Sequence, residues 1–363
     1  MKSNIIIPAI ALTLSLNTFA MTPDQMKVEE EKNLNTPEPL TITTEWDKTF
    51  PKSDKVDHSK ITFVNRYGIT LAADQYKPKD AKGKLPAIAV CGPFGAVKEQ
   101  AAGLYAQEMA ERGFLTIAFD PSFTGESGGR PRYMSSPDIN TEDFSAAVDY
   151  LVTNPDVDPE RVGIIGICGW GGIALNAASS DPRIKATVAS TMYDMSRVNA
   201  NGYFDAADSA EDRDQLREKL AEQRTEDYRN GYPKLGGGLP DERPSEPLFV
   251  AQYWDYYKTP RGYHKRSLNS NGGRNATSPI PWINFPLMSR LDEVDNAVMI
   301  VHGEKAHSFY FGHDAYEKLK LTPGKDNNKL FMVIPGATHT DLYDQKQFIP
   351  FDRITAFFTE YLK

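Results

Sequence analysis

The sequence predicts an α/β fold built on a doubly wound, mostly parallel β-sheet with an inserted cap region. Short, continuously apolar segments recur along the chain, and helical patterns separate them. Strands that are apolar on both sides belong in a parallel sheet with helices on both faces. The chain has 363 residues, of which 40% are hydrophobic and 25% charged. These proportions are typical of a globular protein, and they exclude a collagen-like, disordered or disulfide-stapled chain.

The regular pattern begins with an antiparallel hairpin. Residues 61–64 and 69–72 are strand-like segments on either side of the turn signal Tyr67-Gly68, and we expect them to form an antiparallel edge of the sheet. The predicted elements that follow are a strand at 85–90, a helix at 104–111, a strand at 115–119, a helix from Thr141, a strand at 161–166, a helix at 173–178, strands at 186–190, 297–301 and 330–334, and a closing helix at 354–362.

The alternation stops between about residues 194 and 292. A strongly charged helix is predicted at 209–230, where Ser209 and Asp212 form a capping box, and the rest is rich in glycine, proline and aromatic residues. We interpret this long insertion as a cap over the carboxyl edge of the sheet, where α/β folds place ligands. The alternative is a surface excursion whose aromatic side chains only pack against each other.

The first 58 residues are predicted to lie apart from the sheet. Residues 1–20 combine a positive start, an apolar run and the small-residue ending Thr18-Phe19-Ala20, which is typical of a cleavable secretory signal. A buried N-terminal helix is the alternative. Residues 21–58 are interpreted as a polar arm and residues 59–363 as the α/β domain. The protein is therefore expected to be periplasmic or secreted, and no later segment is apolar enough to span a membrane.

Charge and histidine spacing exclude several classes of partner. Lys and Arg total 41 against 49 Asp and Glu, giving a net charge of −8 with no basic tract, so a nucleic-acid partner is not expected. The intervals between His302, His307 and His313 match no common zinc pattern. We expect no metal, no cofactor and a small-molecule partner, and the sequence does not predict the oligomeric state.

The main candidate for chemistry is Cys168. A predicted strand ends at Ile167, a glycine-rich turn follows, and a helix begins, which is the context of a nucleophile elbow. The neighbours of a protruding nucleophile must be small, and the amino end of a helix favours a thiolate. The alternative is an inert buried thiol beside a glycine turn.

Other catalytic groups occur in the expected chain order. His339 lies in the loop between the last strand and the last helix, where an α/β hydrolase carries its base. An oxyanion loop is predicted after the strand that ends at Val90. Because Pro93 has no N–H, the first donor there is Phe94, and Gly169 supplies the second.

From about residue 60 the sequence resembles α/β hydrolases of the dienelactone-hydrolase type, which use a cysteine in a Gly-x-Cys-x turn. It is still more similar to a capped, peptidase-like bacterial branch of that superfamily. The resemblance implies the α/β-hydrolase fold and a hydrolase activity without a cofactor. The motifs that carry it are Val97-Lys98-Glu99-Gln100, Phe119-Asp120, Gly125-Glu126-Ser127-Gly128-Gly129, Pro335-Gly336 followed by His339, and Asp341-Leu342-Tyr343.

The sequence departs from this pattern at two places. Trp170 stands where a small residue usually follows the nucleophile, and it crowds the turn unless the adjacent glycines make room. The loop after Gly303 has no aspartate at the usual position for the triad acid. Glu304 is the nearest carboxylate to orient His339, and Asp194 is the alternative. Asp120 and Glu126 are expected to hold the catalytic-edge loop in shape.

These residues predict hydrolysis of an ester or thioester, lactones included. His339 would remove the thiol proton, Cys168 would attack the carbonyl carbon, and His339 would then activate water to release the acyl-enzyme. Two alternatives stay open, a non-catalytic ligand-binding protein and an acyltransferase. The second cysteine, Cys91, ends a strand next to that of Cys168, and a disulfide between them would silence the enzyme.

Overall fold

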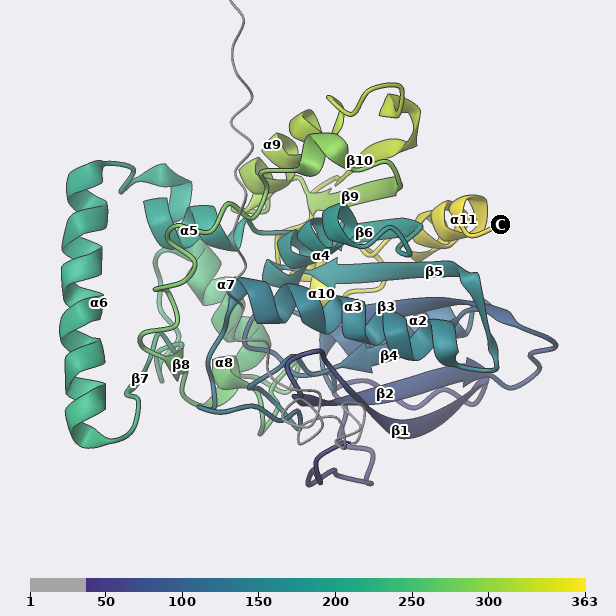
Figure 1. Ribbon diagram of the computed structural model, residues 1–363, viewed down its shortest axis with the longest axis horizontal. Coiled ribbons are helices and arrows are strands. Elements are labelled where there is room, and N and C mark those ends of the chain that lie inside the picture. Colours follow the sequence, from purple (N-terminus) through teal and green to yellow (C-terminus); the bar gives the residue numbers. More distant parts are fainter. Residues whose placement is uncertain (1–36) are drawn as a thin grey trace, which may run out of the picture.

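The computed structural model describes residues 37–363, and its centre is one eight-stranded sheet (Figure 1). The order of the strands is β1-β2-β4-β3-β5-β6-β9-β10. The predicted signal peptide (1–20) and the arm as far as residue 36 lie outside the described residues. The strands are β1 (Val56–Val64), β2 (Thr70–Pro78), β3 (Leu85–Cys91), β4 (Leu115–Phe119), β5 (Val157–Ile167), β6 (Ala186–Ser190), β9 (Ala297–Gly303) and β10 (Lys329–Ile334).

Strand directions confirm the predicted mostly parallel sheet. β1 pairs antiparallel with β2 as the predicted hairpin, and β2 also pairs antiparallel with β4. All other neighbours in the sheet are parallel. Continuously apolar sequences suit these central strands because both faces are covered, as in β4, where all five residues are buried.

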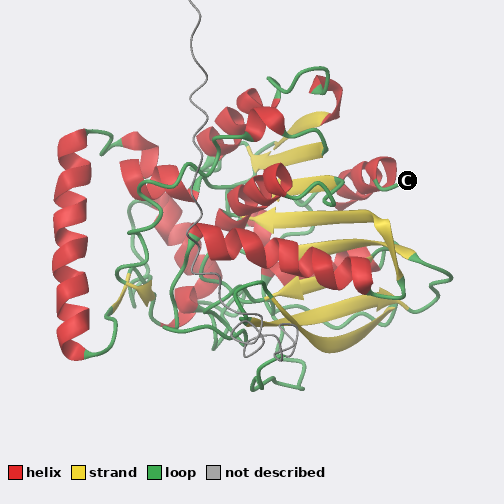
Figure 2. Cartoon of the chain, viewed as in Figure 1, coloured by secondary structure: helices red, strands yellow, loops and turns green. Residues whose placement is uncertain are grey.

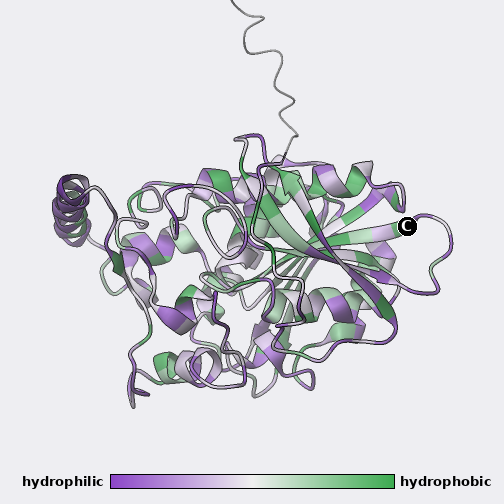
Figure 3. Ribbon diagram, turned by 90° about the horizontal axis from the view of Figure 1, so that it is seen from below, coloured by the Kyte–Doolittle hydropathy of each residue, from purple (hydrophilic) through white to green (hydrophobic). Residues whose placement is uncertain are grey.

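Helices cover both faces of the sheet, and the strands form an apolar layer between them (Figures 2 and 3). α3 packs against α4, and α2 packs against α11. α3 begins four residues before the predicted Thr141 because Pro137, with its fixed φ, suits the first turn of a helix. The helices beside the sheet are α2 (Ala101–Ala110), α3 (Pro137–Thr153), α4 (Gly169–Ser180), α9 (Phe309–Leu319), α10 (Asp341–Asp344) and α11 (Phe351–Tyr361), with a 3-10 turn, η3, at Asp326–Asn328.

The chain between β6 and β9 lies beyond the carboxyl ends of the parallel strands, on the left in Figure 1. The predicted charged helix is confirmed as α6, and the Ser209 hydroxyl accepts a hydrogen bond from the Asp212 amide at 3.0 Å. We call residues 195–293 the cap segment. Its elements are α5 (Met195–Asn201), η1 (Tyr203–Asp205), α6 (Ala210–Asn230), β7 (Leu235–Gly236), α7 (Leu248–Tyr257), α8 (Leu268–Asn271), β8 (Arg274–Asn275) and η2 (Leu291–Glu293).

The described part of the predicted arm, residues 37–58, is more integrated than its polar composition indicates. Phe50 is buried in the hydrophobic core, and Lys48 forms a buried ion pair with Asp74 at 2.9 Å. β1 already begins at Val56. The prediction that this segment contributes nothing to the core is therefore wrong, because one aromatic residue and one paired lysine attach it. No helix among residues 37–363 is long and apolar enough to cross a membrane.

Candidate active site

Cys168 occupies a strained turn between β5 and α4. Its φ is 59° and its ψ is −126°, a conformation that non-glycine residues rarely adopt and that is concentrated at functional sites. The turn is also crowded: a Cβ on Gly166 would lie 2.1 Å from the Trp170 carbonyl oxygen, and one on Gly172 would lie 2.1 Å from the Tyr193 carbonyl oxygen. These positions therefore require glycine, and the structure has the geometry predicted for a nucleophile elbow.

Trp170 does not obstruct this turn. Its ring is buried and packs edge-on against Phe119 and Phe144, at centroid distances of 6.1 and 5.7 Å. The departure from a small residue is thus accommodated by the aromatic core beneath the elbow. Cys91 and Cys168 are both buried free thiols, although Cys91 pairs with Gly166 on the neighbouring strand.

The two predicted oxyanion donors converge on the cysteine. The backbone N–H groups of Phe94 and Gly169 both approach the Cys168 sulfur closely enough to lower the pKa of its thiol. The cap segment holds the Phe94 loop from the other side, because the Asn269 side-chain amide donates to the Phe94 carbonyl at 2.8 Å and the Leu268 amide donates to the Gly95 carbonyl at 2.9 Å. The pair of amides can therefore stabilise negative charge that develops beside the sulfur.

A buried charge cluster supports the same loop. The Lys98 ammonium lies 2.8 Å from an Asp120 carboxylate oxygen, 2.7 Å from Glu126 and 2.8 Å from Glu99. The Lys98 backbone N–H also donates to Asp120 at 2.8 Å. These contacts confirm that Asp120 and Glu126 hold the loops at this edge in shape. We call Lys98, Glu99, Asp120 and Glu126 the Lys98 cluster.

His339 is fully buried, and hydroxyl groups surround its imidazole ring. Nδ1 lies 2.6 Å from the Ser308 Oγ and 2.9 Å from the Thr191 Oγ1, while Nε2 lies 2.9 Å from the Tyr343 hydroxyl oxygen. The rings of Tyr193 and Tyr253 pack edge-on against it, at 5.2 and 5.4 Å. Within residues 37–363, no carboxylate hydrogen-bonds to this histidine.

The prediction that Glu304 orients His339 is wrong in this geometry. The Glu304 side chain is exposed, and its carboxylate accepts a hydrogen bond from the Gly336 amide at 2.8 Å. Asp194, the alternative, caps α5 by accepting from the amides of Ser196 and Arg197. Both carboxylates are thus used by nearby backbone groups, and Ser308 and Thr191 occupy the position of the triad acid.

Tyr343 belongs to the Asp341-Leu342-Tyr343 motif, and the sequence predicted no role for it at the site. Its hydroxyl contacts His339 Nε2 at 2.9 Å and also lies close enough to the Cys168 sulfur to lower the pKa of the thiol. Tyr343 therefore lies between the thiol and the imidazole and connects them. Its position four residues after His339, on α10, is the only signal for this that the sequence carries.

Burial decides the protonation states at rest. It raises the pKa of the Cys168 thiol, although hydrogen bonds from Tyr343, Phe94 and Gly169 act in the opposite direction. Burial likewise lowers the pKa of His339 well below its ordinary value, and His307 and His302 add to the effect. Desolvation of the sulfur thus opposes the tendency of the amino end of α4 to favour a thiolate. The site at rest holds a neutral thiol and a neutral imidazole.

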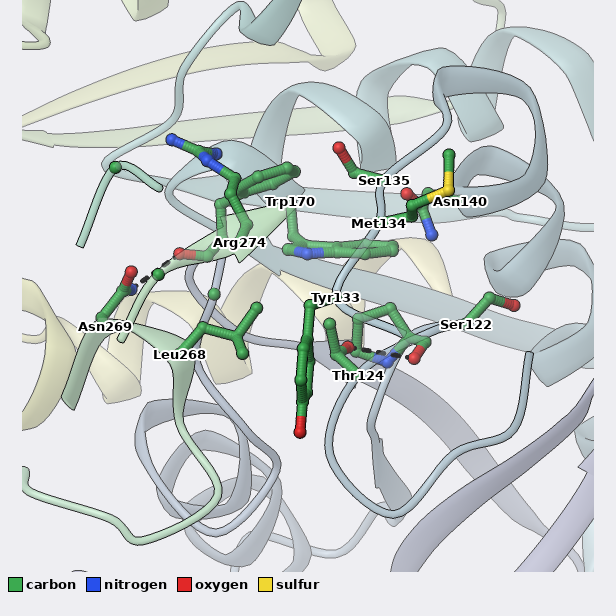
Figure 4. A pocket seen from close by; sticks show the side chains of 15 residues that line it. Ser122, Thr124, Tyr133, Met134, Ser135, Asn140, Trp170, Leu268, Asn269 and Arg274 are labelled. Atoms are coloured by element: carbon green, nitrogen blue, oxygen red, sulfur yellow. Dashed lines mark hydrogen bonds between the residues drawn. The ribbon is translucent and has the colours of Figure 1, made fainter. Parts of the chain in front are cut away.

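Cys168 opens into a cavity of about 250 Å³ between the sheet edge and the cap segment. Several cap aromatics line it, so part of the aromatic cluster does face a hollow, while Tyr203 and Phe249 also pack against each other at 4.8 Å. A second hollow adjoins it, with cap residues on one side and core residues on the other (Figure 4). The wall of the first cavity consists of Phe94, Cys168, Tyr193, Met195, Val198, Asn199, Tyr203, Gly237, Leu239, Tyr253, Tyr257, Asn269, Arg274 and Tyr343.

Nothing in the described part of the chain suggests a metal centre: across residues 37–363, no three side chains of the ligating types come together in a suitable group.

Comparison with known proteins places the chain among hydrolases. Residues 67–332 match the family model for X-Pro dipeptidyl-peptidase (S15 family). PA2218 of Pseudomonas aeruginosa is 53% identical over 89% of this chain and 86% of its own length, and its crystal structure superposes with a TM-score of 0.85 over 89% of this chain and 99% of that one. The α/β hydrolase GrgF from Penicillium is 18% identical and covers 84% of this chain and 99% of its own, with a TM-score of 0.69, which confirms the predicted α/β-hydrolase fold.

A partial relative has a stated activity. A thiohydrolase, aneE of Aspergillus aculeatus, is 32% identical over 136 residues, which cover 38% of this chain and 42% of that protein.

Proposed function

The chain belongs to the X-Pro dipeptidyl-peptidase (S15) family, and on this premise we propose that it hydrolyses esters or thioesters, lactones included, through an acyl-enzyme on Cys168. The observation that carries the proposal is the environment of the sulfur. Two backbone amides and the Tyr343 hydroxyl approach it closely enough to lower the pKa of its thiol, and that hydroxyl also contacts His339. A candidate nucleophile, an oxyanion donor and Tyr343 thus line one cavity, and the candidate proton acceptor, His339, is buried directly behind Tyr343.

The proton leaves the thiol through Tyr343. The Cys168 S–H proton passes to the Tyr343 oxygen while the Tyr343 proton passes to His339 Nε2, so the phenol stays neutral overall. The sulfur then attacks the carbonyl carbon, and the amides of Phe94 and Gly169 receive the oxyanion. When the tetrahedral intermediate collapses, the imidazolium returns a proton through the same route to the leaving thiol or alcohol. His339, through Tyr343, then takes a proton from water, whose oxygen attacks the acyl carbon; the C–S bond breaks, the acid is released and the proton returns to the Cys168 sulfur.

Ester and thioester carbonyls suit a cysteine better than amides do. A thiolate leaves the tetrahedral intermediate more readily than an amine, so an attack on an amide tends to reverse. The proposal therefore assigns thioesters to this chain in preference to the peptides that the family description names. The partial similarity to a thiohydrolase supports the same choice.

We also propose that the protein is exported to the periplasm or secreted, because residues 1–20 have the pattern of a cleavable signal peptide. An oxidising compartment could join the two cysteines, but the structure contains both as free thiols. We propose that the exported protein keeps Cys168 reduced.

A non-catalytic ligand-binding protein is the second candidate. One observation favours it: His339 contacts the hydroxyls of Ser308 and Thr191 where a hydrolase triad has a carboxylate. Such a protein would keep the cavity and the strained elbow without turning over a substrate.

The test is turnover of S-hexanoyl-N-acetylcysteamine, followed by acid quenching and mass spectrometry. We expect release of thiol and a transient hexanoyl adduct on the peptide that carries Cys168. Cys91→Ala, which replaces the other buried thiol, should leave both signals intact, whereas Cys168→Ala should abolish both. Absence of thiol release from the wild-type protein, with no adduct on Cys168, would favour the binding protein.

Replacement of Tyr343 by phenylalanine is expected to lower kcat roughly 10–100-fold and to change KM little. The substitution keeps the ring but removes the oxygen that connects Cys168 to His339. Tyr256→Phe is the matched control, because Tyr256 is equally buried and its ring packs against that of Tyr343 at 5.0 Å, yet it does not line the cavity. Equal kinetics for the two variants would contradict the relay.

A further inference from the structure

Arg274 has an unusual position for an arginine. It comes from the two-residue strand β8 of the cap segment and lines the cavity that contains Cys168 as well as the adjoining hollow shown in Figure 4. Among the described residues that line the cavity, Arg274 alone carries a full charge. A single cation therefore faces an otherwise aromatic, apolar and amide-lined space.

This cation has no counterion in the described structure. No carboxylate within residues 37–363 forms an ion pair with it, and no described residue accepts a hydrogen bond from its guanidinium. Its one specific contact is with the Phe94 ring, 4.7 Å from the guanidinium carbon. Two other arginines of the cap segment differ: Arg197 pairs with Asp205 and Asp314, and Arg266 pairs with Asp47 and Glu99.

Leaving such a group unpaired is costly. The Arg274 side chain is half-buried, and desolvation lowers the pKa of its guanidinium from the ordinary value. A charge withdrawn from water usually has a partner or coordinates an ion. Cation–π contact with phenylalanine offsets only a small part of the desolvation. An anionic group of a bound ligand would supply the counterion that the described chain does not provide.

We propose that Arg274 binds a carboxylate on the acyl group of the substrate, so that the enzyme acts on thioesters or esters of dicarboxylic acids. This inference rests on the proposed function, because it assumes that the acyl carbon is held at Cys168. The planar guanidinium matches a carboxylate through two parallel hydrogen bonds. One arginine also matches a monoanion in charge, whereas a phosphate dianion would leave a negative charge uncompensated.

The volume of the cavity is consistent with a short acyl chain of this kind. A cavity of about 250 Å³ has room for a chain of a few carbons and its terminal carboxylate. The apolar and aromatic wall suits the methylene groups, and Arg274 provides the specific polar contact.

The first test compares two thioesters of equal chain length. S-adipoyl-N-acetylcysteamine ends in a carboxylate and S-hexanoyl-N-acetylcysteamine ends in a methyl group. We expect the wild-type kcat/KM to be about 10–100-fold higher for the adipoyl compound. Arg274→Gln should remove that preference by slowing the adipoyl reaction alone, and Arg274→Lys should retain part of it. Arg229→Gln, at an exposed position near the end of α6, is the control and should keep the full preference.

The outcomes separate this inference from the proposed function. Equal turnover of both compounds by the wild type overturns the carboxylate site and leaves the hydrolase standing. A preference that survives in Arg274→Gln also overturns it. A loss of turnover for both compounds in Arg274→Gln would mean that Arg274 only positions Phe94 or supports the thiolate, and would equally contradict the proposal.

A second test needs no catalysis. Hexanoate and hexanamide have the same shape, but only hexanoate is charged. We expect hexanoate to slow the alkylation of Cys168 by iodoacetamide in the wild-type protein, and hexanamide to have little effect. The protection should disappear in Arg274→Gln. Equal protection by both compounds, protection by neither, or hexanoate protection that persists without Arg274 would overturn the proposal even if no thioester is ever hydrolysed.

Discussion

Alanine in place of His339 is expected to lower kcat for thioester hydrolysis on the order of 10³-fold. Burial raises the pKa of the Cys168 thiol, so very little thiolate forms without a proton acceptor. In the proposed mechanism, His339 is the base that takes the thiol proton, and it contacts Tyr343 on the route to the sulfur. Initial rates with S-hexanoyl-N-acetylcysteamine measure the loss. Iodoacetamide alkylation of Cys168 should slow in parallel.

Two further measurements test the environment of this histidine. Ser308→Ala removes one partner of Nδ1 and leaves Thr191, so we expect kcat to fall only about tenfold.

The lowered pKa of His339 keeps the imidazole neutral, and thus able to accept a proton, at pH values where an ordinary histidine is protonated. The midpoint of the acid limb of kcat/KM should therefore lie well below the ordinary histidine pKa of about 6.5. An acid limb at that ordinary value, or full activity in His339→Ala, would refute this role.

Local sequence patterns predicted the sheet well. Apolar runs such as 115–119 coincide with strands, because a strand buried on both faces has only one kind of environment. The capping box at Ser209 likewise marks the start of α6, since the contact is made within one helical turn. Local patterns did not predict burial that depends on contacts between residues far apart in the sequence. Phe50 becomes part of the core only because the sheet beside it offers an apolar surface.

The same distinction applies to the site. Cys168, Phe94 and Gly169 follow strand ends, so the elbow and the two amide donors could be placed from the chain alone. The partners of His339 could not, because Thr191 and Ser308 lie 148 and 31 residues away and neither is a carboxylate. Glu304 was predicted as the acid because of its position in the loop, but its carboxylate accepts a hydrogen bond from the Gly336 amide and not from His339. Arg274 stands in a part of the sequence without regular pattern, and only the structure places it in the cavity.

Methionine in place of Lys98 is expected to reduce the free energy of unfolding by about 3–5 kcal/mol, since it breaks a buried ion pair by removing one partner. Lys98 is fully buried, and its ammonium contacts Glu99, Asp120 and Glu126. Methionine fills much of the same volume, so the loss comes from carboxylates left without their main partner. Urea unfolding at pH 7.5, followed by tryptophan fluorescence and far-UV circular dichroism, gives the value. Lys84→Met, at an exposed position without a described ion pair, should change stability by less than about 0.5 kcal/mol.

The pH dependence of that loss distinguishes electrostatics from packing. In the wild type, burial alone would raise the pKa of Glu126 and of Glu99, but the Lys98 ammonium reverses the effect and lowers both, Glu99 to about 2 with help from Arg266. These carboxylates therefore contribute stability above the unfolded pKa of about 4.3, and that contribution is lost as the pH falls through the folded values. In Lys98→Met the same groups should take up protons at a higher pH, which relieves their unpaired charge. The difference between variant and wild type should thus be largest near neutral pH and should shrink toward pH 4. A difference that stays constant from pH 8 to 4 would show that the side chain acts by packing alone.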